Sequence, residues 1–399
     1  MGEYTDYEHF TDYPIFDADQ HLAEPDDCYT QHIESKYRDR TIQLLERDGK
    51  RWLAVDGRLH AKEVQGNRMA RPGSLREFLK AMKQGVSDSD AYQWMAPDPA
   101  FFDARQRLAM MDRQHVEACI LYSNGNGLLA ENWIDDEDLY YASSWSYLRW
   151  VAAEWGFSTA NRMFVAPVFS FRNPRRTLEQ LDWFYEHGGK IVCLVTGPAY
   201  GRSPADPHYD AIWDRINGAN GLVAYHINES IPGYKRSRSA AWGEPLDPGF
   251  YDQSAWQWFW AYGDVPAQET FASLVYGNLF GRFPNLKVLS AEHGAEWIPL
   301  FLRKLDKMRG MGRGGPWIGG QLTERPSHTF RRHFKVVPYW EDDLTEVVSR
   351  VGHEVLLGGS DFPHPEGLAA PTRLVEHLHM LDDSHQRAVM RDHGMALFS

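Results

Sequence analysis

The stretch Tyr13-Pro-Ile-Phe-Asp-Ala-Asp-Gln-His-Leu-Ala-Glu-Pro25 places a short apolar run directly before a group of acidic and histidine residues. Its first half, residues 13–18, predicts a β-strand, and runs that are almost wholly apolar are typical of buried parallel strands. Similar runs occur at residues 118–122, 163–169, 191–195, 222–227, 286–291, 333–337 and 354–359. The sequence therefore predicts eight strands, of which the seventh is the weakest because it carries charge and ends at Pro338.

Segments with helical spacing separate most of these strands, for example Arg107-Leu-Ala-Met-Met-Asp-Arg113 and Leu178-Glu-Gln-Leu-Asp-Trp-Phe184. Eight alternating strand and helix units predict an α/β fold of the (β/α)8 (TIM) barrel class, as one domain over residues 1–399. Three long stretches are expected to be insertions that cover the C-terminal mouth of the barrel, at about residues 28–100, 229–270 and 308–332. From length alone, two or three ordinary domains fit equally well.

The charge of the chain excludes several kinds of partner. It has 42 Lys and Arg residues against 55 Asp and Glu residues, a formal net charge of −13. Nucleic acid and anionic membranes are not expected to bind, because phosphate binding needs a concentrated positive surface. No run of 18 apolar residues and no secretory signal are visible, so we expect a cytoplasmic protein that does not enter the membrane.

Asp19 and His21 alternate along the first predicted strand, so both side chains are expected to point to one side at its C-terminal end. His226 ends the fifth predicted strand and Asp361 follows the eighth. Each of the last two residues also has an explanation without a metal, since a His after an apolar strand is often a core residue and an Asp before Phe-Pro is a common turn residue. Because parallel strands in a barrel end at one rim, the four residues together predict a site for zinc or manganese.

His293 follows the sixth predicted strand, and Glu296 comes three residues later, on what is expected to be the first turn of a helix. Histidine is suited to proton transfer near neutral pH, and a carboxylate can orient it through a hydrogen bond. Taken alone, the pair is explained as well by the start of a helix. The catalytic interpretation therefore depends on the residues at the other strand ends.

The chain resembles the amidohydrolase-2 branch of the amidohydrolase superfamily in four motifs, Asp19-Gln-His21-Leu-Ala-Glu24-Pro, Tyr225-His226, His293-Gly-Ala-Glu296-Trp and Gly359-Ser-Asp361-Phe-Pro-His-Pro. This branch includes metal-dependent decarboxylases for aminocarboxymuconate semialdehyde, dihydroxybenzoates and carboxyvanillate. The likeness extends over nearly the whole chain and implies a barrel that acts on a small molecule, an aromatic or related unsaturated acid. It also implies a homodimer or higher homo-oligomer.

By position, the resemblance implies that Asp19, His21, His226 and Asp361 hold one divalent ion and that His293, Asp361 and Glu296 are catalytic. Many relatives carry His-x-His at the first strand, whereas some aromatic-acid decarboxylases carry an acidic residue followed by x-His, as this chain does. Zinc is the metal expected first. Manganese is a close second, because a carboxylate ligand favours this harder metal more than a second imidazole would. The bridging lysine of binuclear relatives has no counterpart at the end of the fourth strand, so one ion is expected.

The reaction expected from this resemblance is decarboxylation, in which Asp361, or His293 acting with it, protonates the carbon that bears the carboxylate. The same ligands suit a hydrolase of a lactone, amide or other C–O or C–N bond. A third interpretation is a non-catalytic barrel that binds metal, because a fold alone does not determine a function. The linear sequence does not separate the first two reactions.

Overall fold

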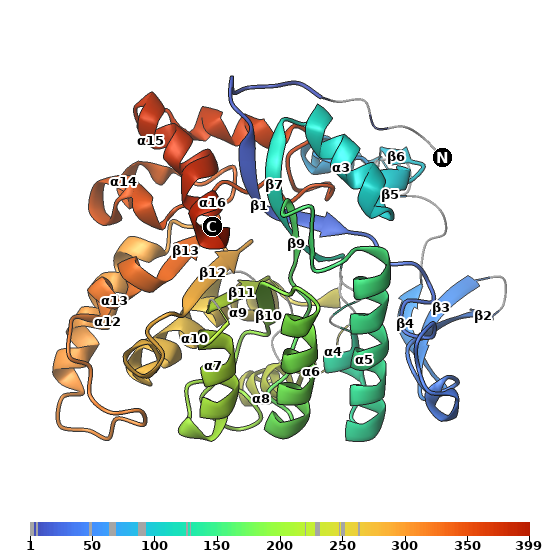
Figure 1. The fold of residues 1–399 in the computed structure, drawn as a ribbon, viewed down its shortest axis with the longest axis horizontal. Coiled ribbons are helices and arrows are strands. Elements are labelled where there is room, and N and C mark those ends of the chain that lie inside the picture. The colour runs from blue at the N-terminus through green and yellow to red at the C-terminus, as the bar shows by residue number, and fades with distance from the viewer. Residues whose placement is uncertain are drawn as a thin grey trace. The chain divides into compact units, whose positions relative to one another are not determined.

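The computed structural model of the chain describes residues 4, 7–47, 50–63, 69–86, 93–124, 127, 129–219, 221–227, 232–246, 248, 252–261 and 264–399. The structure is a mixture of helices and strands (Figure 1). Its residues form two compact units. The first unit comprises Met1–Val165 and Leu357–Ser399, and the second comprises Ala166–Leu356.

A four-stranded sheet is the centre of the first unit, with the order β1-β7-β9-β8. β1 (Ile15–Leu22) pairs in parallel with β7 (Val116–Ser123), and β7 pairs in parallel with β9 (Met163–Val165). The short β8 (Ser158–Thr159) pairs antiparallel with β9. Every residue of β1 is buried, which agrees with the apolar pattern expected of a strand covered on both faces.

Helices and smaller sheets surround this sheet. α3 packs on β7, and the C-terminal α16 packs on β1. Between β1 and α3 the chain forms a three-stranded antiparallel sheet and a two-stranded one. These further elements are β2 (Gln43–Arg47), β3 (Lys50–Val55), β4 (Arg58–Glu63), β5 (Met69–Ala70), α1 (Leu75–Lys83), β6 (Trp94–Met95), α3 (Ala104–Arg113), α4 (Leu129–Trp133), α5 (Glu137–Glu154), α15 (Asp383–Arg387) and α16 (His393–Phe398).

The second unit has a parallel sheet with the order β10-β11-β12-β13. Its strands are β10 (Ile191–Leu194), β11 (Leu222–His226), β12 (Lys287–Ala291) and β13 (Phe334–Val336). Single bridges extend both edges of this sheet, because Val168 pairs with Cys193 and Leu356 pairs with Val336.

The helices of the second unit are α6 (Pro174–Glu186), α7 (Asp210–Asn217), α8 (Pro232–Trp242), α9 (Ala255–Ala261), α10 (Asp264–Tyr276), α11 (Leu279–Arg282), α12 (Ile298–Met311), α13 (Pro326–His333) and α14 (Leu344–Val351). α6 begins where the Asn173 side chain accepts a hydrogen bond from the backbone of Arg176 and Pro174 follows, a common start for a helix. Trp260 of α9 is 1% exposed, so part of the Trp-rich run is core packing. Within the described residues, no helix combines the length and the apolar character needed to cross a bilayer.

Seven of the eight predicted strands are present in the described part of the chain, and the eighth is not. His353–Val355 is a 3₁₀ turn, and Leu356 makes one isolated bridge. This segment is apolar because it is buried, but Gly358 and Gly359 in it are poor strand formers. The described strands form separate open sheets, so the closed barrel stays a prediction.

His333, at the end of α13, is buried as a neutral imidazole. Its Nδ1–H donates to the Leu286 carbonyl oxygen at 2.7 Å, and its Nε2 accepts from Arg332 Nε at 3.2 Å. Burial lowers the pKa of His333 from 6.5 to about 4, whereas the unfolded chain keeps the ordinary value. The stability that depends on the neutral ring is therefore complete above pH 6.5 and is lost as the pH falls from 6.5 toward 4.

We expect the variant His333→Asn to lose most of this acid sensitivity, on the order of 2 kcal/mol of unfolding free energy between pH 6.5 and pH 4. The measurement is urea unfolding across that pH range, compared with the wild type. His328→Asn, an exposed position on the same helix, is the matched control and should keep the wild-type pH dependence. Equal pH slopes in the wild type and His333→Asn would contradict the prediction.

Candidate metal centre

The end of β1 brings Asp19 and His21 together. The pairing of β1 with β7 shifts register between Asp17 and Gln20, and Gln20 Nε2 donates to Asp17 Oδ2 at 2.8 Å. The Asp17 carboxylate therefore accepts from Gln20 and, at 3.2 Å, from the Asp19 backbone N–H. Bulges near functional sites often redirect a side chain in this way. His21 Nε2 lies 3.5 Å from Asp19 Oδ1, and both side chains are almost fully buried.

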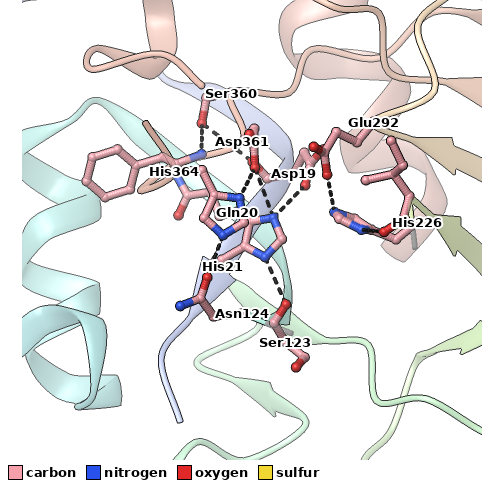
Figure 2. A network of polar contacts seen from close by, with 12 residues as sticks. Asp19, Gln20, His21, Ser123, Asn124, His226, Glu292, Ser360, Asp361 and His364 are labelled. Atoms are coloured by element: carbon pink, nitrogen blue, oxygen red, sulfur yellow. Dashed lines mark hydrogen bonds and ion pairs between the residues drawn. The ribbon is translucent and has the colours of Figure 1, made fainter. Parts of the chain in front are cut away.

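Asp361 completes this cluster within the first unit (Figure 2). Its Oδ1 lies 3.1 Å from His21 Nε2 and 2.7 Å from His364 Nδ1. Burial alone would lower the pKa of His21, but Asp19 and Asp361 raise it well above its ordinary value. Burial likewise opposes the charge of Asp361, but His364 and His21 hold its pKa below the usual range. The cluster is therefore organised around two carboxylates that attract a positive charge.

Asp17 joins β1 to the chain segment that contains Asp361. Its carboxylate accepts from the Ser360 backbone N–H at 2.9 Å and from Ser360 Oγ at 2.6 Å. The Asp361 N–H also donates to the Asp19 carbonyl oxygen, at 2.8 Å. Burial raises the pKa of Asp17 to about 7, although the hydrogen bonds of Ser360 and Gln20 act in the opposite direction. These contacts fix Asp19 and Asp361 relative to each other.

Arg107 supports the same strand end from α3. It is fully buried, and its Nη2 donates to the His21 carbonyl oxygen at 2.6 Å while its Nη1 donates to Gln20 Oε1 at 3.3 Å. Burial lowers the pKa of Arg107 to about 10. The guanidinium therefore holds the backbone of the cluster and takes no part in the cluster itself.

In the second unit, His226 ends β11 and is 8% exposed. Its Nδ1–H donates to the Ile227 carbonyl oxygen at 3.0 Å, which leaves Nε2 as the acceptor nitrogen, and Nε2 lies 3.3 Å from Glu292 Oε2 (Figure 2). Glu292 directly follows β12 and has a φ of 57°. Left-handed backbone at a residue other than glycine is sparsely populated and often marks functional sites.

His293 is 2% exposed, and its Nδ1 lies 3.0 Å from Ser290 Oγ. Glu296, expected to orient it, is exposed and accepts a hydrogen bond from the Asp343 N–H at 2.8 Å. α12 begins only at Ile298, so Glu296 precedes the helix and does not lie in its first turn as expected. Ser290 therefore takes the place next to the His293 ring that was expected of Glu296.

The segment around His293 is held by a half-buried carboxylate. Asp342 Oδ2 accepts from the Ala295 N–H at 2.6 Å and from the Tyr339 N–H at 3.0 Å. Burial raises the pKa of Asp342 to about 6, although both hydrogen bonds lower it. Gly294 has a φ of 66°, and a Cβ there would lie 2.7 Å from Tyr339 Cδ2. Glycine is therefore required at this turn.

Several side chains of these clusters were not in the predicted site: Asp17, Ser290, Glu292 and His364. His364 lies in the Gly359–Pro365 motif and Glu292 directly precedes His293, so both had a signal in the sequence. The structure groups Asp19, His21 and Asp361 in the first unit, and His226 with Glu292 in the second.

The donor atoms of the first unit fit a divalent ion. Metal bonds to imidazole nitrogen and carboxylate oxygen are about 2.0–2.2 Å long, so neighbouring donors around one ion lie roughly 2.8–3.5 Å apart. The distances of 3.1 and 3.5 Å from His21 Nε2 to the carboxylates of Asp361 and Asp19 fall in this range. His21 Nδ1–H donates to the Ser123 carbonyl oxygen at 3.0 Å, so Nε2 is the nitrogen that would bind an ion in place of a proton.

Comparison with known proteins identifies relatives over the whole chain. The family model described as Amidohydrolase matches residues 16–393. An amidohydrolase from Mycobacterium avium subsp. paratuberculosis K-10 is 27% identical, with 98% of each chain covered and a TM-score of 0.84. None of the curated proteins matches the chain.

Two decarboxylases share the fold at 13% identity. The 5-carboxyvanillate decarboxylase of Novosphingobium aromaticivorans DSM 12444, in complex with manganese and 4-hydroxy-3-methoxy-5-nitrobenzoic acid, covers 97% of this chain and 96% of its own, with a TM-score of 0.61. The dihydroxybenzoic acid decarboxylase of Polaromonas sp. JS666, with bound manganese and the inhibitor 2-nitroresorcinol, covers 97% of each chain, with a TM-score of 0.58.

Proposed function

Because the chain belongs to the amidohydrolase family, we propose that it is a metal-dependent decarboxylase of an aromatic or related unsaturated acid. The observation that carries the proposal is the buried cluster of Asp19, His21 and Asp361, whose donor atoms have the spacing of metal ligands. The two manganese-containing decarboxylases with the same fold support it, because both are described as decarboxylases of aromatic acids.

The proposal includes one (β/α)8 barrel to which the strands of both units belong. The strands β1, β7 and β9 of the first unit and β10 to β13 of the second are parallel within their sheets and follow the order of the sequence. In such a barrel, the C-terminal strand ends that carry Asp19, His21 and His226 belong to one face, where these enzymes have their active sites.

In this proposal, Asp19, His21, His226 and Asp361 hold one divalent ion, either manganese or zinc. The bound ion would neutralise the substrate carboxylate and stabilise the negative charge that develops as the C–C bond breaks. His226 contributes through Nε2, because its Nδ1–H is engaged by the Ile227 carbonyl oxygen. Hydrogen bonds of this chain thus set Nε2 as the metal-facing nitrogen of both His21 and His226.

His293 is proposed to move the proton, with Asp361 acting beside it. The ring carbon that bears the carboxylate gains a proton from His293 Nε2, the nitrogen that does not face Ser290. The C–C bond then breaks, its electron pair returns to the ring, and carbon dioxide leaves. Glu296 is proposed to act indirectly, because its hydrogen bond to Asp343 ties the segment after His293 to the start of α14.

The test is carbon dioxide release by metal-free protein loaded with Mn²⁺ or Zn²⁺, with hydroxybenzoates and 5-carboxyvanillate as substrates. We expect the protein to release carbon dioxide only when Mn²⁺ or Zn²⁺ is bound. One bound ion without gas release from any of these acids would contradict the decarboxylase proposal, and absence of bound metal would contradict the site itself.

A metal-dependent hydrolase is the second candidate, because the relative at 27% identity is described as an amidohydrolase. The same ligands can activate water for attack on a lactone or amide. Metal-dependent release of acid from lactones or amides, without carbon dioxide from the acids above, would favour it. A chain that binds the ion but turns over neither group of compounds would be the non-catalytic barrel.

Asp17 is not a proposed ligand, but its hydrogen bonds are expected to affect the affinity for the metal. Asp17→Asn should weaken Mn²⁺ binding about 10- to 100-fold, because the amide cannot accept all the hydrogen bonds that fix Asp19 and Asp361. Titration of the protein with Mn²⁺, followed by the free-ion signal in electron paramagnetic resonance, measures the change. Asp12→Asn, an exposed carboxylate five residues earlier, is the control. Unchanged affinity in Asp17→Asn would show that the network does not position the ligands.

A further inference from the structure

We propose that His364 is a further ligand of the same ion, through Nδ1. The inference rests on the proposed function in requiring that the chain binds a metal through the proposed ligands, His226 among them, and not on which reaction it performs. It starts from the position of Asp361 Oδ1, which lies between His21 Nε2 at 3.1 Å and His364 Nδ1 at 2.7 Å. The centroids of the two imidazole rings are 3.9 Å apart (Figure 2).

The outer nitrogens of both rings are oriented by consecutive residues at the end of β7. His21 Nδ1–H donates to the Ser123 carbonyl oxygen at 3.0 Å, and His364 Nε2–H donates to Asn124 Oδ1 at 2.5 Å. Histidine ligands of metals typically donate the other ring N–H to an oxygen in this manner, which fixes the tautomer. His364 therefore has the same arrangement as His21, with Nδ1 and not Nε2 as the nitrogen turned toward the cluster.

The inner nitrogens of the two rings, His21 Nε2 and His364 Nδ1, both face the same carboxylate oxygen of Asp361. A positive charge among these three atoms is attracted to the carboxylate and can be shared by both nitrogens. A divalent ion shared by His21, Asp361 and His364 supplies that charge. These three side chains offer one donor atom each within 4.8 Å of one another, which meets the spacing of a metal site.

The backbone around His364 is anchored, so the side chain does not depend on the metal for its position. The His364 N–H donates to the Asp361 carbonyl oxygen at 2.9 Å, and the His364 carbonyl oxygen accepts from the Gly73 N–H at 3.2 Å. The next residue, Pro365, accepts from the Leu75 N–H at 2.8 Å, at the start of α1. The side chain of His364 is 21% exposed, so the donor is fixed but lies toward the open side of the cluster.

His364 also affects the expected choice of metal. With it, the proposed ligand set contains five side chains: Asp19, His21, His226, Asp361 and His364. Structural and catalytic zinc sites usually take three or four protein ligands, whereas manganese accepts a larger mixed set of oxygen and nitrogen donors. The larger number of ligands therefore suits Mn²⁺, whereas the third imidazole suits Zn²⁺, and both ions remain candidates for this site.

The experiment compares His364→Ala with the wild type, each loaded with Mn²⁺, by pulsed electron paramagnetic resonance and by metal titration. The wild type should show the ¹⁴N coupling of three coordinated imidazoles, and His364→Ala the coupling of two. Mn²⁺ affinity should fall at least tenfold. Asn124→Ala, which leaves His364 in place but removes the acceptor of its Nε2–H, should keep the coupling of three imidazoles and lower affinity less.

His385→Ala is the matched control, because His385 Nδ1 pairs with Asp382 Oδ2 at 3.0 Å with the same three-residue spacing, but on the surface. It should leave coupling and affinity unchanged. A His364→Ala protein that retains three coordinated imidazoles would overturn the inference and make His364 an orienting partner of Asp361. A wild type that binds no Mn²⁺ would instead refute the metal site of the proposed function. If His364→Ala does not fold, wild-type affinity in Asn124→Ala overturns the inference.

Discussion

Replacing His293 by alanine should lower kcat by about 10²- to 10⁴-fold while the protein keeps its bound ion. The imidazole is 2% exposed and lies against Ser290 Oγ, so its orientation is fixed before substrate binds. In the proposed reaction it moves a proton and is not a ligand. The measurement combines carbon dioxide release with metal content per chain, determined on the same preparation.

Ser290→Ala separates orientation from proton transfer at this position. It removes the hydroxyl at 3.0 Å from Nδ1 but leaves the imidazole, so a loss of about tenfold in kcat is expected, together with a shifted pH profile. His208→Ala, an exposed histidine of the same unit, should retain wild-type turnover. Loss of the ion in His293→Ala would make His293 a ligand and would contradict its role in proton transfer.

Most strands could be predicted from the sequence because burial on both faces leaves a continuous apolar run. The predicted run 222–227 is a strand over Leu222–His226, and 286–291 is a strand over Lys287–Ala291. The run 354–359 is also apolar and buried, but it does not form a strand. Leu356 and Leu357 are buried without a continuous ladder, and the 3₁₀ turn His353–Val355 directly precedes them. Apolar composition indicates burial, and burial alone does not distinguish a strand from an extended segment.

The parts of the site that could be predicted are those that follow from strand ends. Asp19 and His21 were expected together from alternation, and they lie 3.5 Å apart. The place of Asp17 depends on a register shift in β1, which no residue pattern reports. The tautomer of His364 depends on Asn124, which is 240 residues away in the chain. Contacts between such distant residues arise from the fold and have no periodicity that a single sequence can show.

Replacing Asp361 by asparagine should remove both the bound ion and turnover. Its Oδ1 contacts His21 Nε2 and His364 Nδ1, so the residue is at the centre of the donor cluster. Asparagine is the informative substitution because Asp361 has a φ of 54°, a left-handed conformation that Asn adopts far more readily than Ala. The variant therefore keeps the backbone and the size of the side chain and removes the negative charge. We expect Mn²⁺ affinity to fall by about two orders of magnitude, which corresponds to about 3 kcal/mol of binding free energy.

Asp382→Asn is the control for this change, because Asp382 pairs with His385 on the surface with the same spacing as Asp361 and His364. Asp361→Asn without metal should still unfold cooperatively on heating, since the backbone hydrogen bonds of residue 361 to Asp19 and His364 are unchanged. If the ion stays bound while turnover is lost, Asp361 acts in proton transfer and is not a required ligand. If both metal and turnover persist, the carboxylate at the centre of the cluster has no part in the site, and the proposed ligand set is wrong.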